Sequence, residues 1–172
     1  MNRSDLDYDG EHGDATVRLR PPLFGHEVVV QFFPDLDGDG EVTDRMLAAA
    51  TDVERLGPEH RSALAALLYA HAERCFESTD YGHDTRPGEG VTEANRRAFG
   101  VRTVEDALRE AGRPEYVQVS EEDDSRAARF AVLVYYPPWE DEHGCGVVLR
   151  DGVPVGWGPA SVYVGEFDEG EA

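Results

Sequence analysis

The sequence of 172 residues predicts one α+β domain with a mainly antiparallel sheet. Three observations support this prediction. Alternating β-branched segments occur near both ends of the chain, helix-forming segments lie between them, and the hydrophobic fraction of 40% is ordinary for a globular protein. We expect an N-terminal hairpin and a C-terminal meander packed with a helical pair and two short helices. Residues 15–166 are expected to form this domain, between an acidic flexible N-terminus at 1–14 and an acidic tail at 167–172.

The first hairpin is predicted from residues 15–33. The segment ATVRLR at 15–20 alternates between apolar and polar residues, as a half-buried strand does. HEVVVQFF at 26–33 is rich in β-branched and aromatic residues, which favour strands. The proline and glycine residues of the intervening RPPLFG indicate a turn, so we expect the two strands to pair with each other.

The next two segments predict the helical pair. Thr43 can cap the first helix with its hydroxyl, and Gly57 followed by Pro58 ends it. A second helix begins at Pro58, whose missing N–H costs nothing in a first turn, and continues to Ser78. Spacings of three and four residues put one set of side chains on a single face of this helix, which we expect to be buried. The set is Leu64, Leu68, His71 and Cys75.

Two short helices and a run of strands complete the predicted fold. VTEANRRAF and TVEDALREAG are expected to be helical with Thr92 and Thr103 as candidate caps, and Asp106 completes an approximate capping box with Thr103. The Asp-Gly pair at 151–152 predicts a tight hairpin turn, because such turns need positive φ angles. The C-terminal strands are expected at EYVQVS (115–120), AARFAVLVYY (127–136), GCGVVLR (144–150), VPVGWG (153–158) and ASVYVGEF (160–167).

The chain is strongly acidic, with 36 Asp and Glu residues against 16 basic residues and a formal net charge of −20. Such a surface repels nucleic-acid phosphates and anionic membranes, so we expect neither as a partner. It would attract a basic protein and accelerate the encounter with it. The alternative interpretation is that the acidity only keeps the protein soluble.

The sequence shows no sign of export or membrane insertion. No apolar run is long enough to span a bilayer, and the N-terminus lacks the basic and apolar regions of a secretory signal. Cys75 and Cys145 lie far apart in unlike contexts, which favours reduced thiols in a cytoplasmic protein, with a single disulfide as the alternative.

The stretch PDLDGDGEVTDRM at 34–46 matches the start of an EF-hand calcium loop. Alternating aspartates would occupy the first, third and fifth positions, and Gly40 would allow the sharp turn at the sixth. The twelfth position is Met46, where the template has a bidentate glutamate, so the site would need a carboxylate from elsewhere. The alternative is an acidic turn that leads into a helix. The candidate calcium ligands are Asp35, Asp37, Asp39, Glu41 and Thr43.

Catalytic patterns are weak in this sequence. The six histidines show none of the spacings that are typical of metal sites. His71 and Cys75 could share a metal, but their apolar stripe favours a buried structural pair. His143 lies near Cys145, yet the surrounding negative charge disfavours a thiolate nucleophile. No phosphate-binding loop or nucleophile elbow occurs, so we expect neither an enzyme nor a cofactor, and an enzyme of unrecognised type is the third hypothesis.

The most distinctive segment is YYPPWEDEHGCGVVLRDGVPVGWGPASVYV at 135–164. Trp139 is followed by the Glu-His-Gly triplet at 142–144, a strand and the Asp-Gly pair at 151–152. This pattern resembles a bacterial family of unknown function with a C-terminal Trp-x-x-Glu-His-Gly turn and an Asp-Gly hairpin. Families of this kind occur near toxin-immunity and antitoxin genes, so the resemblance implies an immunity or antitoxin-like role. It brings no catalytic residue, and Cys145 stands where an aliphatic residue is commoner.

We therefore predict a non-enzymatic acidic binding protein that neutralises a basic partner, for instance a toxin domain, with a calcium-binding module as the alternative. Aromatic side chains would anchor the interface inside a ring of carboxylates, and Glu142 would cap an N–H group or bind His143. A purely structural connection between strands is the alternative for this turn. The expected aromatic anchors are Tyr135, Tyr136, Trp139 and Trp157. The predicted partner-binding residues are Trp139, Glu140, Asp141, Glu142, His143 and Trp157.

Overall fold

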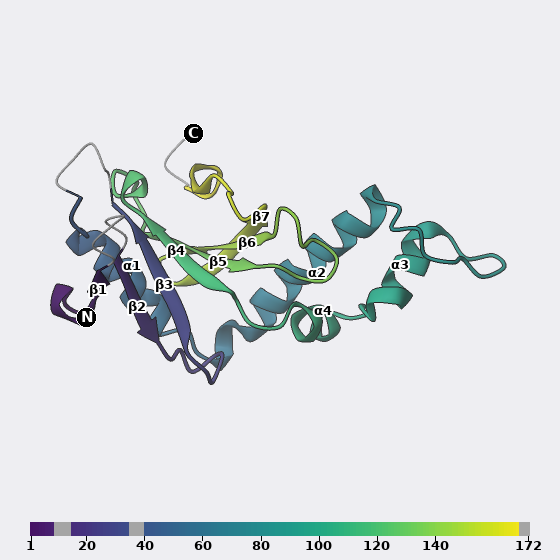
Figure 1. Ribbon diagram of the computed structural model, residues 1–172, viewed down its shortest axis with the longest axis horizontal. Helices are drawn as coiled ribbons and strands as arrows, with labels where there is room; N and C mark the ends of the chain where they lie inside the picture. The colour runs from purple at the N-terminus through teal and green to yellow at the C-terminus, as the bar shows by residue number, and fades with distance from the viewer. Residues whose placement is uncertain (9–14, 35–39, 169–172) are drawn as a thin grey trace.

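The computed structural model describes residues 1–8, 15–34 and 40–168. Within these residues, seven strands form one sheet whose spatial order follows the order of the chain (Figure 1). The strands are β1 (Asp7–Tyr8), β2 (Ala15–Leu19), β3 (Val28–Phe33), β4 (Tyr116–Ser120), β5 (Phe130–Tyr135), β6 (Cys145–Arg150) and β7 (Val153–Gly158). The prediction of an α+β fold with a mainly antiparallel sheet is confirmed.

One parallel pairing joins the two predicted parts of the sheet. The β2–β3 hairpin and the β4–β7 meander pair antiparallel, as expected, whereas β3 and β4 run parallel with Val30 opposite Val117. Two neighbouring parallel strands begin at the same end of the sheet, so the chain must return from the end of β3 to that end before β4 can start. The helical region between Phe33 and Tyr116 provides this crossover.

Among the described residues, four α-helices lie in the crossover, and side-chain caps explain where α1 and α4 start. They are α1 (Asp44–Glu54), α2 (Arg61–Ser78), α3 (Val91–Phe99) and α4 (Val104–Ala111). The Thr43 hydroxyl accepts a hydrogen bond from the Met46 amide at 3.1 Å, and Thr103 forms the predicted capping box with Asp106. The expected cap at Thr92 is wrong, because the chain enters α3 through Gly90.

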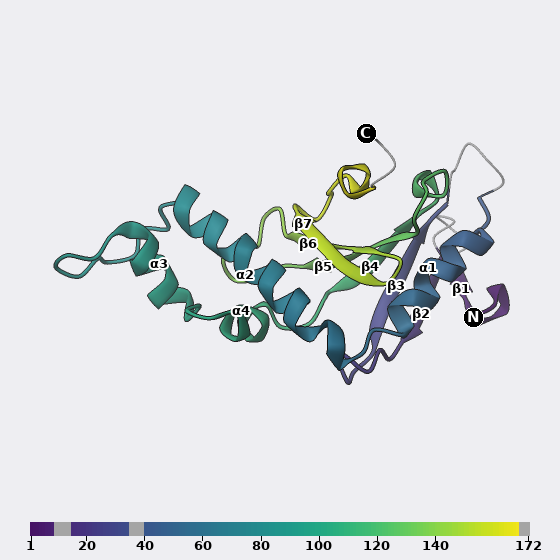
Figure 2. The same ribbon diagram turned by 180° about the vertical axis from the view of Figure 1, so that it is seen from behind.

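The main hydrophobic core lies between the helices and one face of the sheet. Figure 2 shows α1 and α2 crossing in front of the strands. The predicted inner face of α2 is confirmed, since all four of its residues are buried. They are Leu64, Leu68, His71 and Cys75. The contacts of α2 with β6 and β7 fix this helix on the sheet.

A smaller second core covers the other face of β5–β7. The short 3₁₀ helix η4 (Val164–Phe167) packs there, with Val164 beside Val132 and Val148. The prediction of a last strand at 160–167 is therefore wrong. The apolar residues of this segment cover a face of the existing sheet and do not extend the sheet. An alternating pattern of apolar residues indicates which side chains are buried, but it does not by itself establish a strand.

The ordered fold begins before residue 15, where we expected a flexible N-terminus at 1–14. Arg3–Asp5 form a 3₁₀ turn, β1 pairs with β2, and Leu6 is only 8% exposed. Residues 9–14 lie outside the described residues, as does the end of the predicted acidic tail from residue 169 onward. None of the described helices combines the length and the apolar character needed to cross a bilayer.

Candidate functional site

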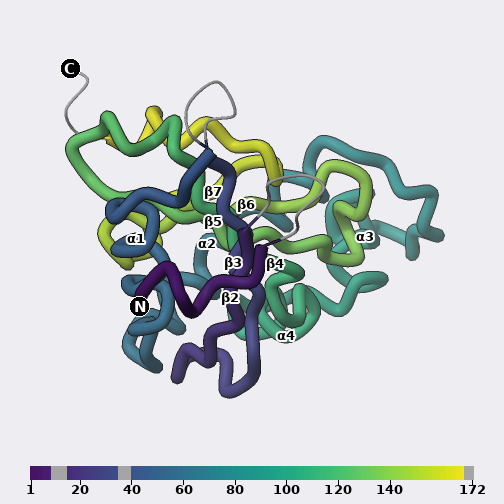
Figure 3. Tube along the Cα trace, turned by 60° about the vertical axis from the view of Figure 1, so that its left-hand side comes forward, coloured from purple at the N-terminus to yellow at the C-terminus, as the bar shows by residue number. Residues whose placement is uncertain are grey.

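Three acidic segments from distant parts of the sequence meet at one end of the sheet. Because β3 and β4 are parallel, the segments that follow them emerge at the same edge. The Thr43 hydroxyl contacts the Asp124 carboxylate, and Asp168 accepts a hydrogen bond from the Ala127 amide at 3.2 Å. Figure 3 shows the three segments at the same end of the molecule. We call this surface the acidic end, and it comprises Glu41, Asp44, Glu121, Glu122, Asp123, Asp124, Glu166 and Asp168.

An arginine of α1 holds the acidic end together. The guanidinium of Arg45 donates hydrogen bonds to the carbonyl oxygens of Arg126, Ala127 and Ala128, at 2.8, 3.2 and 2.8 Å. A planar guanidinium can satisfy several acceptors at once, which fixes the loop after β4 against the start of α1. The positions of the neighbouring carboxylates are therefore set by the fold.

A second arginine links this loop to the C-terminal segment. Arg126 forms an ion pair with Asp123 at 2.8 Å, and its guanidinium lies 4.8 Å from the centre of the Tyr163 ring. The pKa of Arg126 is raised above its ordinary value, first by Asp123 and then by Tyr163. Asp123 thus serves an internal pair, whereas the side chains of Glu122 and Glu166 are exposed to solvent.

Two exposed aromatic side chains accompany these carboxylates. Tyr163 is 58% exposed and Phe33, at the end of β3, is 39% exposed. Phe33 is opposite Ser120, the residue that precedes the acidic turn of η3 (Glu121–Asp123). Aromatic residues are enriched in protein interfaces, and exposed carboxylates around them would attract a cationic partner.

The predicted partner-binding turn at 139–143 is built differently from our expectation. Trp139 is 1% exposed and Tyr135 is fully buried, so the prediction of these two as surface anchors is wrong. Glu140, rather than Glu142, accepts hydrogen bonds from the amide (3.1 Å) and Nδ1 (3.3 Å) of His143. The side chains of Asp141, Glu142 and His143 are exposed, and Trp157 is half-buried.

Behind this turn lies a buried polar network that joins α2 to the segment after β5. The Trp139 indole donates to Nδ1 of His71 at 3.1 Å, and the Tyr81 hydroxyl donates to the Trp139 carbonyl oxygen at 2.6 Å. The Sγ atom of Cys75 lies 3.8 Å from Nε2 of His71 and 4.0 Å from a carboxylate oxygen of Glu140. The prediction of a buried pair of His71 and Cys75 is confirmed.

The geometry of this network does not favour a cysteine nucleophile. Nδ1 of His71 accepts a hydrogen bond from the Trp139 indole N–H, so the neutral imidazole ring carries its own proton on Nε2. This nitrogen faces Cys75. This nitrogen therefore cannot remove the thiol proton. Burial lowers the pKa of His71 to about 4 and raises the pKa of Cys75 to about 11. Both shifts stabilise the neutral forms, as a structural role requires.

The second cysteine is equally protected. Cys145 is fully buried, and burial raises the pKa of its thiol to about 12. Both cysteines are free, so the alternative of a disulfide between Cys75 and Cys145 is not realised. His143 is exposed while Cys145 points into the core, so the structure does not assemble them into one site.

The calcium prediction falls mostly on residues that the structure leaves undescribed. Asp35, Asp37 and Asp39 lie outside the described residues. Glu41 is exposed, and the hydroxyl of Thr43 caps α1 while contacting Asp124. Within residues 1–8, 15–34 and 40–168, no three His, Cys, Asp or Glu side chains gather in a way that could hold a metal ion.

Sequence reasoning missed the aromatic residues of the acidic end. Tyr163 lies close to Glu166 in the sequence, and Phe33 directly precedes the acidic stretch that begins after Pro34. An aromatic residue beside an acidic cluster is the signal that could have identified them. Both residues fall in predicted strands, where an aromatic side chain is expected in the core.

Comparison with known proteins places the chain in a family. No curated protein and no solved structure matches it. A family model described as "Domain of unknown function (DUF6985)" matches residues 4–170, nearly the whole length of the sequence. The chain therefore belongs to this uncharacterised family of DUF6985 domains.

Proposed function

We propose that this chain is a non-enzymatic binding protein whose acidic end neutralises a basic protein, as an immunity protein neutralises a toxin domain. The observation that carries the proposal is the meeting of three acidic segments around two exposed aromatic residues, Phe33 and Tyr163. In this interface the carboxylates steer a cationic partner, and the aromatic rings supply the apolar contact area.

The rigidity of the acidic end supports this function. Arg45 and Arg126 fix the loop after β4 through hydrogen bonds and an ion pair. A preorganised surface loses little conformational entropy on binding, so more of the contact energy contributes to affinity. The net charge of −20 adds long-range attraction that weakens as salt is added.

The direct test uses the product of the neighbouring gene as the binding partner. We expect a basic protein that forms a complex with this chain in calorimetric titrations at low ionic strength. The affinity should fall as sodium chloride is added, because exposed charges are screened beyond a Debye length of about 10 Å at 0.1 M salt. If a toxic activity accompanies that gene product, the complex should suppress it.

Charge variants locate the binding surface. Glu122→Gln/Glu166→Gln removes two charges from the acidic end, and Asp141→Asn/Glu142→Gln removes two from the turn at 139–143. A third pair, Glu54→Gln/Glu77→Gln, changes the net charge equally at exposed helix positions and is the matched control. We expect only the first pair to slow association markedly, because rim charges act mainly on the rate of encounter.

Substitutions of exposed aromatic residues provide a second, independent test of where the partner binds. Tyr163→Ala should weaken binding by about tenfold or more, since truncating a central interface aromatic commonly removes over 1 kcal/mol. Tyr136 is 46% exposed beside the other turn and serves as the control. Loss of affinity with Tyr136→Ala and Asp141→Asn/Glu142→Gln alone would move the interface to that turn. Equal effects from all charge pairs, or no complex at low ionic strength, would overturn the proposal.

One observation also favours the calcium alternative. The carboxylate of Asp124 arrives beside Thr43, so a ligand from another segment reaches the end of the acidic loop. Such a carboxylate could replace the glutamate that the loop lacks at Met46. Calcium binding would raise the melting temperature at millimolar ion, and Asp124→Asn would abolish this effect. A titration without heat or thermal shift would eliminate this function.

A further inference from the structure

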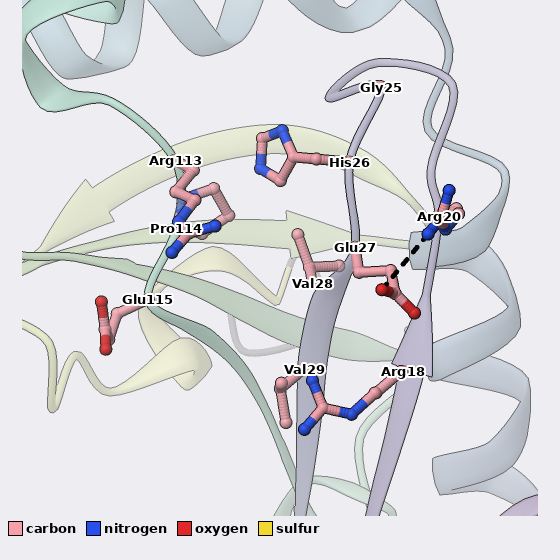
Figure 4. A pocket seen from close by; sticks show the side chains of 10 residues that line it. All are labelled: Arg18, Arg20, Gly25, His26, Glu27, Val28, Val29, Arg113, Pro114 and Glu115. Carbon is pink, nitrogen blue, oxygen red and sulfur yellow. Dashed lines mark hydrogen bonds and ion pairs between the residues drawn. The ribbon is translucent and has the colours of Figure 1, made fainter.

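A basic concavity lies at the opposite end of the sheet from the acidic end. It has a volume of about 550 Å³ and is formed where β2 ends and where β3 and β4 begin (Figure 4). Its polar lining contains three arginines and a histidine, together with two glutamates. These residues are Arg18, Arg20, His26, Arg113, Glu27 and Glu115.

The positive charge of this concavity contrasts with the strongly acidic composition of the chain. Several arginine side chains of this chain are held by carboxylates, as in the pairs of Arg97 with Glu89 and Arg129 with Asp52. By contrast, Arg18 and Arg113 form no hydrogen bond or ion pair with any residue that the structure describes. Two guanidinium groups without partners among the described residues therefore line the same cavity.

The strand geometry explains why these cations share one site. Arg18 lies on β2 between the buried Val17 and Leu19, so its side chain projects to the sheet face opposite the main core, and Arg20 directly follows the strand. Arg18 is opposite Val29 of β3, and Figure 4 shows its side chain extending across toward Val29. Arg113 comes from the segment that enters β4, whose parallel pairing with β3 brings it to the same place.

The glutamates of the lining do not neutralise this site fully. Glu27 binds Arg20 at 3.3 Å, and both side chains are largely exposed. Glu115 donates its amide to the Val134 carbonyl oxygen, and its carboxylate forms no ion pair with a described residue. Three guanidinium groups thus face two carboxylates, which leaves a local excess of positive charge in a chain of net charge −20.

A histidine of the lining, His26, carries an unsatisfied ring nitrogen. Nε2 of His26 is buried and has no hydrogen-bond partner among the described residues. A buried polar nitrogen without a partner costs about 1–3 kcal/mol, so such atoms are usually satisfied. His26 also borders a neighbouring cavity of about 300 Å³ that Leu23, Phe24 and Leu108 line.

We propose that the basic concavity binds the oxyanion group, phosphate or carboxylate, of a small anionic molecule. Guanidinium groups match the oxygen atoms of both anions through paired N–H donors. In this site Arg18 and Arg113 bind the anionic molecule at separate places in the concavity, and Arg20 contributes positive charge. The concavity has room for a molecule that is larger than a single phosphate ion.

The test measures binding of defined anions to the full chain. Inorganic phosphate, glycerol 3-phosphate and succinate are titrated at low ionic strength by calorimetry and two-dimensional NMR, with sodium chloride at matched ionic strength as the blank. We expect saturable binding of at least one anion, with chemical-shift changes at residues 18–20, 26–29 and 113–115. Phosphate binding identifies a phosphorylated ligand, and succinate binding alone identifies a carboxylate.

Matched variants separate a built site from general charge effects. Arg18→Gln/Arg113→Gln should weaken binding about tenfold or more, because each charge-assisted hydrogen bond contributes strongly. Arg55→Gln/Arg102→Gln removes two other exposed arginines and should leave binding unchanged. If the double variant does not fold, the single variant Arg113→Gln replaces it, because Arg113 lies outside the strands. This variant should also weaken anion binding. Equal loss in both double variants, or no binding of any of the three anions by the wild type, would overturn the proposal.

Discussion

The indole N–H of Trp139 donates a hydrogen bond to Nδ1 of His71 at 3.1 Å, across the junction between α2 and the segment after β5. Both residues are buried. This contact fixes the histidine tautomer and directs Nε2–H toward Cys75. The buried His71–Cys75 pair therefore takes part in the contact that joins α2 to the segment after β5.

His71 makes the stability of the fold depend on pH. Burial lowers its pKa to about 4 from an ordinary value of 6.5, although Glu140 opposes the shift. The unfolded chain takes up a proton below pH 6.5, whereas folded His71 stays neutral until about pH 4. Its contribution is therefore complete above pH 6.5 and is lost as the pH falls toward 4, up to roughly 3 kcal/mol.

Urea denaturation at pH 7 and pH 5 checks this dependence. His71→Gln should lose stability at pH 7 but should show a smaller decline between the two pH values than the wild type. His143→Gln is the control, because the side chain of His143 is 68% exposed. An unchanged pH dependence in His71→Gln would contradict the assignment.

The two thiols should be unreactive in the native protein. Burial raises the pKa of Cys75 to about 11 and that of Cys145 to about 12, so few thiolates exist at pH 8. We expect iodoacetamide to modify neither cysteine in buffer and both in denaturant, as measured by mass spectrometry. Rapid alkylation of native Cys75 would show that the network around His71 opens readily.

Gly144 should tolerate substitution worse than other glycines of positive φ. A Cβ atom there would lie 2.8 Å from the Tyr135 carbonyl oxygen, in addition to the strain of a φ angle of +67°. Gly88 has a φ of +83° but open space around it. We expect Gly88→Ala to lower the free energy of unfolding by about 1–2 kcal/mol, and Gly144→Ala to lower it by about 1–3 kcal/mol more.

Urea denaturation of the two variants separates two effects at these positions, the backbone strain of a positive φ angle and the steric contact of the added Cβ atom. If backbone conformation alone mattered, Gly144→Ala and Gly88→Ala would have equal effects. A larger loss at Gly144 would show that the packing of the turn against Tyr135 limits which residues this position accepts.

The threonine caps offer a paired test of helix termini. Thr103→Ala should destabilise the protein by about 1 kcal/mol, because its hydroxyl satisfies the Asp106 amide at the start of α4. Thr92→Ala should change stability by less than about 0.5 kcal/mol, since Thr92 lies inside α3 and caps nothing. Similar losses in the two variants would contradict the difference between the two helix starts.

Features with a local chemical cause could be predicted from the sequence. Thr43 and Thr103 cap helices because their hydroxyls reach a free amide within one turn. The Asp-Gly turn at 151–152 forms because both residues adopt positive φ angles, 47° and 81°. In each case the residues that determine the structure are neighbours in the chain.

Features that depend on distant contacts could not be predicted in this way. The segment at 160–167 has strand-like alternation, yet it covers the second core as a turn and 3₁₀ helix. Trp139 looks like a surface anchor in the sequence and is buried against His71, a residue of α2. The acidic end needs the parallel register of β3 and β4, which no local pattern encodes.

The parallel pairing of β3 with β4 also dictates an order of assembly. On the ribosome, the nascent β2–β3 hairpin emerges first, while the strand that pairs with the other edge of β3 has not yet been synthesised. Pairing β4 with β3 closes the long connection between these strands, which is slow because of its entropic cost. An unpaired strand edge can meanwhile associate with other chains. Completion of the sheet therefore waits for the helical crossover, and until then the edge of β3 that pairs with β4 is open to other chains.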